Sequence, residues 1–389
     1  MRARHAVRSF IHAVLALGHA VGALLNAAGV HADDAENSTL GLPPIVIPAD
    51  NPITPEKVAL GKKLFMDRRL SPNNTLSCAM CHVPEQAFTQ NELATSVGFE
   101  GKSLRRNAPT LLNVALHDSF QRDGAKASLE AQVWGPLLAH NEMANGAVEV
   151  VVTRINSLTD YQGLFERAFA GKSAGEITVG QAIASYERTL LAGDSRFDRW
   201  YFGAEANALS ADEQAGFRVF MASNCNACHR LDERTAPFTD NGFHNTGVHA
   251  AKQRNASRPI AVQLAPGVSI NVDPASLSAV SEPEMRDDGR FEVSHDLRDL
   301  HAFKTPSLRN VALTAPYMHD GSIATLEDVI NFYSLDFMAQ GEQLISVAQW
   351  SVREKSDLVA FLRSLNASHT ASLINGARAA AVNPRDNPE

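Results

Sequence analysis

The chain has 389 residues, enough for two domains with separate cores, and 44% of them are hydrophobic. Its 35 basic and 43 acidic side chains give a formal net charge of −8. This balance argues against nucleic-acid binding, which requires a basic face, and permits docking of a basic redox partner.

The first 32 residues are expected to be a signal peptide. Arg2, Arg4 and Arg8 form a basic start, the segment 10–30 is mostly apolar, and Val30-His31-Ala32 offers a cleavage site. An uncleaved membrane anchor is the alternative, but polar residues interrupt the apolar segment. Cleavage would leave 32 basic and 43 acidic residues, a net charge of 32 − 43 = −11. We therefore expect an exported, periplasmic protein.

The motif Cys-x-x-Cys-His occurs twice and uses all four cysteines. It is the attachment signature of c-type haem, because two thiols can form thioethers to the haem and the adjacent imidazole can ligate the iron. A zinc site or a redox pair is the alternative, but neither requires a histidine after each pair. The sequence therefore predicts two covalent c-type haems, bound by Cys78, Cys81, His82, Cys225, Cys228 and His229.

Each motif follows a predicted helix. The first helix begins at Thr54-Pro55-Glu56, and the second begins at a capping box, residues 210–213. Both contain Gly-x-x-aliphatic-Phe, at 61–65 and at 216–220. The segments 108–113 and 305–310 are also similar to each other. These paired similarities indicate a duplicated domain.

Each half is expected to close with a second helix, at 178–191 and 351–365, packed across the first. The predicted fold class is therefore mainly α, with two cytochrome c-like haem domains in tandem and long loops. Residues 248–290 are predicted to be irregular. The expected boundaries are a signal peptide at 1–32, haem domains at 33–200 and 201–366, and a disordered tail at 367–389.

The motifs do not identify the residue on the other face of either iron. A sixth protein ligand would make an electron-transfer site, whereas an open position lets peroxide or oxygen bind. The candidate ligands include several tyrosines and also His117, His140, His244, His249, His295, His301, His319, His369, Met143, Met285, Met318 and Met338. On these residues alone, the prediction is a dihaem redox protein.

The residues around the motifs narrow this prediction. They lie in order at 40–44, 50–52, 57–61, 106–110, 135–137, 141–143 and, most strongly, 303–321. Together these segments resemble the bacterial dihaem cytochrome c peroxidase and MauG superfamily over most of residues 40–365. The resemblance implies that the domain at 33–200 is peroxidatic and that the domain at 201–366 transfers electrons.

The resemblance also assigns roles to side chains outside the motifs. Glu142 matches the distal acid–base residue, and Gln132 matches the glutamine beside it. Peroxide must lose a proton to bind iron and gain one to leave as water, and a carboxyl group can do both. Asn107, Thr314 and Pro316 match a calcium site between the domains. From the residues alone, the alternatives are a solvated glutamate and ordinary turn residues.

Two positions differ from the usual peroxidases at the irons. Phe99 stands where these enzymes have a histidine that ligates the resting N-terminal haem, so this haem is expected to be open without prior reduction. A nearby loop residue in that role is the alternative. Tyr333 stands in place of a ligating methionine, as in MauG, and a phenolate favours higher iron oxidation states. The alternative is Met338 or Met318 as the ligand.

Two further positions lack tryptophans of the family. Arg122 replaces the inter-haem tryptophan, and Ser223 replaces the surface tryptophan that MauG uses to oxidise its protein partner. An arginine cannot relay an electron hole as an indole can, so neither fast charge sharing between the haems nor oxidation of a partner by that route is predicted.

The predicted function is that of a periplasmic dihaem c-type peroxidase. It would reduce hydrogen peroxide to water with electrons from a one-electron donor such as a small cytochrome c or a cupredoxin. Two alternatives remain open. One is a MauG-like dihaem oxidase that modifies a protein partner through a high-valent intermediate, and the other is a non-catalytic dihaem electron carrier. The resemblance is also compatible with a homodimer.

Overall fold

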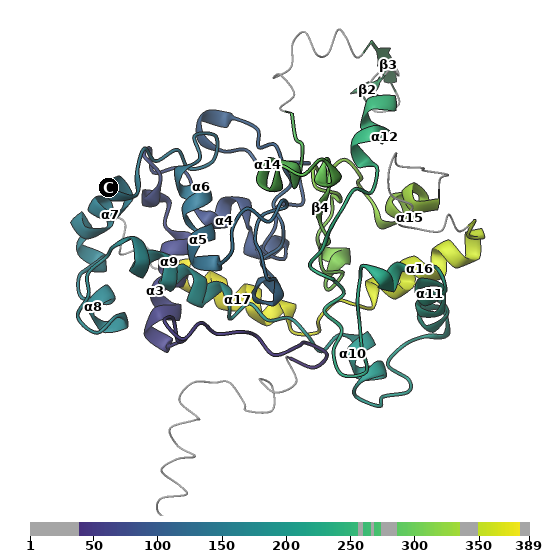
Figure 1. The fold of residues 1–389 in the computed structure, drawn as a ribbon, viewed down its shortest axis with the longest axis horizontal. Coiled ribbons are helices and arrows are strands. Elements are labelled where there is room, and N and C mark those ends of the chain that lie inside the picture. Colours follow the sequence, from purple (N-terminus) through teal and green to yellow (C-terminus); the bar gives the residue numbers. More distant parts are fainter. Residues whose placement is uncertain (1–38, 256–259, 266–267, 274–285, 335–348, 382–389) are drawn as a thin grey trace, which may run out of the picture.

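The computed structural model describes residues 39–255, 260–265, 268–273, 286–334 and 349–381. The predicted signal peptide lies outside the described residues. Within them, helices and long loops predominate, and the strands form two small antiparallel pairs, β1 with β4 and β2 with β3. The mainly α fold class is therefore confirmed, and Figure 1 shows the two halves side by side.

The elements have the following bounds. The α-helices are α3 (Pro55–Met66), α4 (Cys78–Cys81), α5 (Leu129–Gln132), α6 (Trp134–Leu138), α7 (Val148–Ser157), α8 (Leu164–Ala168), α9 (Glu176–Glu187), α10 (Arg196–Tyr201), α11 (Ala211–Ala222), α12 (Val248–Asn255), α14 (Phe291–Ser294), α15 (Leu326–Ser334), α16 (Val352–Arg363) and α17 (Thr370–Ala381). The short 3₁₀ turns include η3 (Phe99–Gly101), η4 (Val114–Leu116), η6 (Cys225–Ala227) and η8 (Val311–Leu313). The strands are β1 (Phe243–His244), β2 (Ile260–Ala265), β3 (Val268–Val272) and β4 (Phe303–Lys304).

The same helix crossing occurs in both halves, as predicted. Helix α3 packs across α9, and α11 packs across α16. A Cβ atom at Gly61 would lie 1.9 Å from the carbonyl oxygen of Ala182, and one at Gly216 would lie 1.9 Å from that of Asp357. The repeated glycine therefore allows the two helix backbones to approach closely in each half.

The second sequence similarity also has a structural counterpart. Asn113 and Asn310 both adopt left-handed backbone conformations, with φ of 62° and 60°, and each precedes a 3₁₀ turn. Their N–H groups donate to the carbonyl oxygens of Leu190 (2.7 Å) and Leu365 (3.1 Å), just beyond the closing helix of each half. Asparagine tolerates this conformation better than most residues, so the two halves share a local device that ties the loop to the closing helix.

The C-terminal segment corrects one prediction. Residues 367–389 were expected to be disordered, but the structure contains α17, which crosses back to lie beside α3 of the N-terminal half (Figure 1). Ala377 is buried and Leu373 packs against the same apolar cluster as Phe65. Packing of an apolar face stabilises a helix that its own sequence would leave marginal. Residues 382–389 lie outside the described part.

The excursion predicted to be irregular also contains regular structure. Its described residues include α12 and the β2–β3 hairpin, in which Ile260 pairs with Val272. Alternating residues with high strand propensity, such as Val262 and Val268, were the overlooked signal.

Candidate functional site

Both motif histidines are held in the same orientation. His82 Nδ1 lies 3.0 Å from the carbonyl oxygen of Pro109 and 3.3 Å from that of Phe88, and His229 Nδ1 lies 3.0 Å from that of Phe238. An Nδ1–H group that donates to a carbonyl fixes the ring and leaves Nε2 free to ligate a metal. Burial also lowers the pKa of His82, to about 4, and the pKa of His229. Both imidazoles therefore fit the role of a proximal haem ligand.

Cys78 and Cys81 lie on the short helix α4, whereas Cys225 begins the turn η6 and Cys228 directly follows it. None of the four forms a disulfide. Cys225, Cys228 and His229 line a cavity of about 310 Å³. The same cavity is lined by residues from the segment 107–122 of the N-terminal half and from the segment 303–319 of the C-terminal half. The C-terminal motif therefore opens onto a cavity shared by the two halves.

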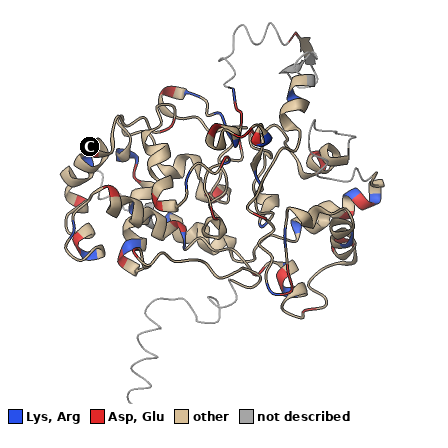
Figure 2. Ribbon diagram, in the orientation of Figure 1, with Lys and Arg blue, Asp and Glu red and all other residues tan. Residues whose placement is uncertain are grey.

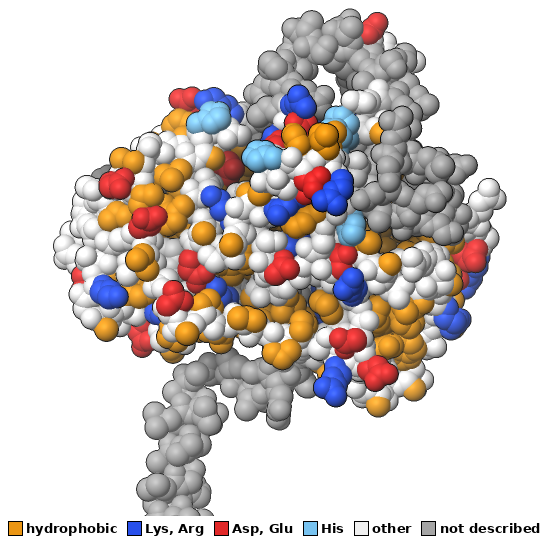
Figure 3. Space-filling model, in the orientation of Figure 1, with side chains coloured by type: hydrophobic (Ala, Val, Ile, Leu, Met, Phe, Trp, Pro, Cys, Tyr) orange, Lys and Arg blue, Asp and Glu red, His pale blue; other side chains and the backbone are white. Residues whose placement is uncertain are grey.

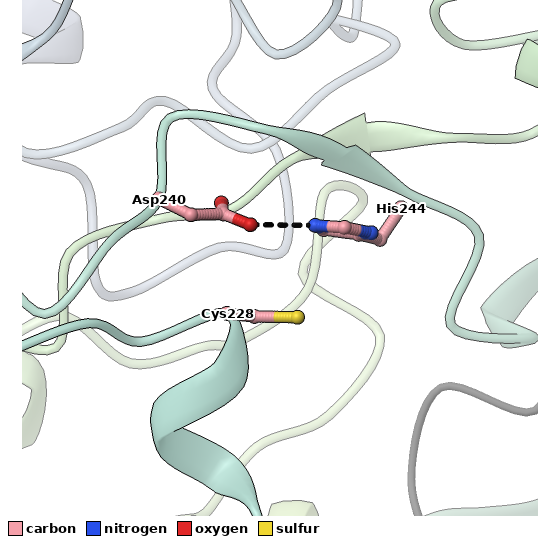
Figure 4. A group of neighbouring side chains, drawn as sticks. All are labelled: Cys228, Asp240 and His244. Carbon is pink, nitrogen blue, oxygen red and sulfur yellow. Dashed lines mark hydrogen bonds and ion pairs between the residues drawn. The ribbon is translucent and has the colours of Figure 1, made fainter.

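Cys228 also lies in a small cluster that resembles a metal site. Its Sγ atom and the ligand atoms of Asp240 and His244 all lie within 4.8 Å of one another (Figure 4). His244 Nε2 and Asp240 Oδ2 are 2.9 Å apart, and hydrogen bonds to Cys228 and Asp240 raise the pKa of His244 to about 9. A thioether at Cys228 would leave only two such ligands, fewer than a structural metal site uses. The cluster therefore fits the haem-attachment site rather than a separate metal centre.

Glu142 lies beside the N-terminal motif. Burial is the largest cause of the raised pKa of Cys78 and Cys81, and the Glu142 carboxylate raises the pKa of both thiols further. Burial likewise raises the pKa of Glu142 itself. The N–H of Phe99 donates to the Glu142 carbonyl oxygen at 2.8 Å, so the loop that carries Phe99 is fastened directly to Glu142. The structure thus brings an elevated-pKa carboxyl group to the N-terminal site.

Gln132 has an unpaired oxygen. Its Oε1 atom is buried and has no hydrogen-bond partner among the described residues. Gln132 ends α5 and Glu142 follows α6, so the two residues flank the same short helix. A buried acceptor without a partner is costly. Gln132 therefore fits a site that a ligand completes.

Phe99 and Tyr333, the two residues that differ from the usual peroxidases near the predicted haems, both have defined contacts in the structure. Phe99 packs against the apolar cluster that contains Met143, and its ring has no atom that could ligate iron. Tyr333 lines the C-terminal cavity with His229, and burial raises the pKa of its phenol to about 12. Met318 lines this cavity too, so both candidate ligands reach it, whereas Met338 lies outside the described residues.

The structure also reveals a residue that the sequence reasoning missed. Ser223 Oγ accepts a hydrogen bond from the indole Nε1 of Trp350 at 2.7 Å, and Trp350 lines the cavity of the C-terminal motif. An indole is therefore present beside the serine that replaces the expected tryptophan. The two residues are 127 positions apart, and no sequence signal pairs them.

The oxygens of one of the three predicted calcium residues are already hydrogen-bonded. Asn107, Thr314 and Pro316 all line the shared cavity. Both oxygens of Asn107, however, accept hydrogen bonds from Arg122.

The fold and the site define a class of protein: two repeated helical domains, each with a motif suited to haem. A model of the di-haem cytochrome c peroxidase family matches residues 55–206. The chain is 37% identical over 332 residues to the methylamine utilization protein MauG of Methylorubrum extorquens, covering 83% of this chain and 82% of the relative. It is 34% identical over 348 residues to the cytochrome-c peroxidase IdrP1 of Denitromonas iodatirespirans, covering 87% and 89%.

A solved structure agrees with these relatives. The crystal structure of a MauG-like protein associated with microbial copper homeostasis matches with a TM-score of 0.68 and 32% identity, covering 89% of this chain and 97% of that one. This chain belongs to the di-haem cytochrome c peroxidase and MauG family. It is a di-haem oxidoreductase, and the predicted family is confirmed.

Proposed function

We propose that this protein is a periplasmic peroxidase that reduces hydrogen peroxide to water with electrons from a small cytochrome c or a cupredoxin. The observation that carries the proposal is a set of three side chains in the N-terminal half. Burial raises the pKa of the Glu142 carboxyl group, and Oε1 of Gln132 has no hydrogen-bond partner in the part of the chain that the structure describes. Phe99 has no atom that could ligate an iron. A site for electron transfer alone would need none of these groups.

Two covalent c-type haems would be bound by the motif cysteines and by Nε2 of His82 and His229. When bound, the N-terminal haem would supply an iron to which peroxide can bind, and peroxide would be the two-electron oxidant. The Nδ1 hydrogen bonds to Pro109 and Phe238 orient the imidazoles for this role.

The protein's own part is proton transfer. Glu142 takes a proton from hydrogen peroxide as it binds and returns one to the departing oxygen, while Gln132 orients the bound molecule. The overall change is H₂O₂ + 2 H⁺ + 2 e⁻ → 2 H₂O, with one electron from each of two donor molecules. Electrons would enter through the C-terminal domain, where His229 and Tyr333 line one cavity and would both hold the second haem.

A MauG-like role, in which a protein partner is oxidised, is the second candidate. Two of the relatives, at 37% and 35% identity, are named MauG, and Phe99 and Tyr333 fit that role. Trp350 beside Ser223 supplies an oxidisable indole near the C-terminal site. A non-catalytic electron carrier is disfavoured because electron transfer alone does not require an acid–base group such as Glu142.

Export is part of the proposal. It rests on the signal-like residues 1–32 and on the attachment of c-type haem outside the cytoplasm. No helix in the described ranges is long and apolar enough to cross a membrane.

The test is stopped-flow spectroscopy of the fully ferric holoprotein mixed with one equivalent of hydrogen peroxide. We expect rapid loss of the ferric Soret band without prior reduction, followed by recovery when reduced cytochrome c is added. No reaction until one haem is reduced would contradict the argument from Phe99. Reaction without oxidation of either a cytochrome c or a cupredoxin would favour the MauG-like role.

A further inference from the structure

The contact between the two halves contains a buried asparagine whose hydrogen-bonding groups are all engaged. The Asn107 N–H donates to the carbonyl oxygen of His319 at 2.8 Å, and Nδ2 donates to that of Ala94 at 3.0 Å. Its oxygens both face Arg122, with Nη2 to Oδ1 at 3.0 Å and Nε to the carbonyl oxygen at 3.4 Å. Asn107 is 4% exposed, so water does not compete for these groups.

The nearby carboxylates are also already paired with cations. Arg106 binds Asp123 at 2.6 Å and Asp287 at 2.7 Å, and Arg105 binds Glu292 at 2.7 Å. These residues join the N-terminal half to the segment around α14, where the ribbon of Figure 2 has acidic and basic residues close together. Figure 3 shows acidic and basic side chains next to one another on this face of the molecule. Ca²⁺ requires about six to eight oxygen ligands, several of them usually carboxylates. The paired acids and the engaged Asn107 do not offer such a set.

Arg122 itself has no acidic partner among the described residues. A guanidinium keeps its positive charge in proteins at neutral pH. The carbonyl oxygen of Arg122 accepts from the N–H of Lys304 at 2.8 Å, which ties this residue to the other half. Arg122 lines the shared cavity with Thr314 and Pro316.

We infer that the guanidinium of Arg122 takes the place of the calcium ion that the family resemblance predicts between the domains. A side-chain cation beside Asn107 repels a divalent cation and already uses the oxygens that would ligate it. The positive charge between the two halves therefore belongs to a side chain of the protein, and the contact between the halves does not require a bound metal ion. This inference is independent of the proposed peroxidase activity.

The decisive measurement uses the wild-type holoprotein with both haems. It is equilibrated with millimolar calcium chloride, gel-filtered into metal-free buffer, and analysed for calcium by mass spectrometry. We expect less than about one Ca²⁺ per ten chains. We also expect the same melting temperature in calcium as in EGTA, within about 1 °C, because a ligand that does not bind cannot stabilise the fold. One retained Ca²⁺ per chain, or a melting temperature lowered by EGTA, would overturn the inference.

A pair of variants tests the specific role of the guanidinium. Arg122→Gln frees both oxygens of Asn107 and adds an amide oxygen, so calcium should now raise its melting temperature. Arg290→Gln is the matched control, because Arg290 lies at the same interface and donates to the carbonyl oxygen of Asp123 but does not contact Asn107. Equal calcium responses in the two variants would refute the replacement. If Arg122→Gln does not fold, the wild-type calcium content still decides.

Discussion

Replacement of Glu142 by glutamine tests the proposed chemistry most directly, because the side chain keeps its size and loses only its ability to move a proton. Glu142 lies beside Cys78 and Cys81, where burial raises its pKa and no ion pair among the described residues opposes this. Loss of a positioned acid–base group costs about 10²- to 10⁴-fold in rate. At about 1.4 kcal/mol per tenfold, this is a barrier increase of about 3–5 kcal/mol.

The assay is the pseudo-first-order rate of Soret loss when the ferric protein is mixed with excess peroxide. Because the carboxylate is the proton acceptor, the wild-type rate should rise with pH through the pKa of Glu142, above the usual glutamate range. Glu142→Gln should lack this rise. Glu100→Gln is the control, since Glu100 lies on the adjoining loop with its side chain 63% exposed. A Glu142→Gln rate within about threefold of wild type would refute the acid–base role and favour the electron carrier.

Three further predictions concern other side chains near the two motifs and in the N-terminal core. Tyr333→Met should raise the reduction potential of the C-terminal haem by tens of millivolts or more in spectroelectrochemical titration, and an unchanged potential would mean that Tyr333 is no ligand. Trp350→Phe should slow oxidation of a protein partner about tenfold or more, with an unchanged initial reaction with peroxide; equal partner oxidation would show that the indole is no relay. Burial raises the pKa of Glu187 to about 8, so the folded state binds this proton more tightly than the unfolded state and loses stability as pH rises from about 4.5 to 8. Over this pH range the free energy of unfolding should fall by about 5 kcal/mol. The free energy measured by urea unfolding of Glu187→Gln should not show this fall, and the same pH dependence in the variant as in the wild type would contradict the burial argument.

The sequence alone predicted the features that short segments specify. The two Cys-x-x-Cys-His motifs, the helix before each one and the closing helices depend on local spacing, capping and apolar periodicity. Gly61 and Gly216 were visible as a repeated pattern, and the structure shows that this pattern allows the same close helix crossing twice. The resemblance added Glu142 and Gln132, and the fold places both beside one short helix.

The tertiary structure determined what depends on segments far apart in the chain. Trp350 reaches Ser223, and α17 packs against α3, because the fold brings distant segments together and buries their apolar faces. The calcium site stays a prediction, because Asn107 was recognised from its neighbours in sequence, whereas the fold places the Arg122 guanidinium against its oxygens. A side chain's type limits its chemistry, but only the packed structure determines which group occupies its hydrogen bonds.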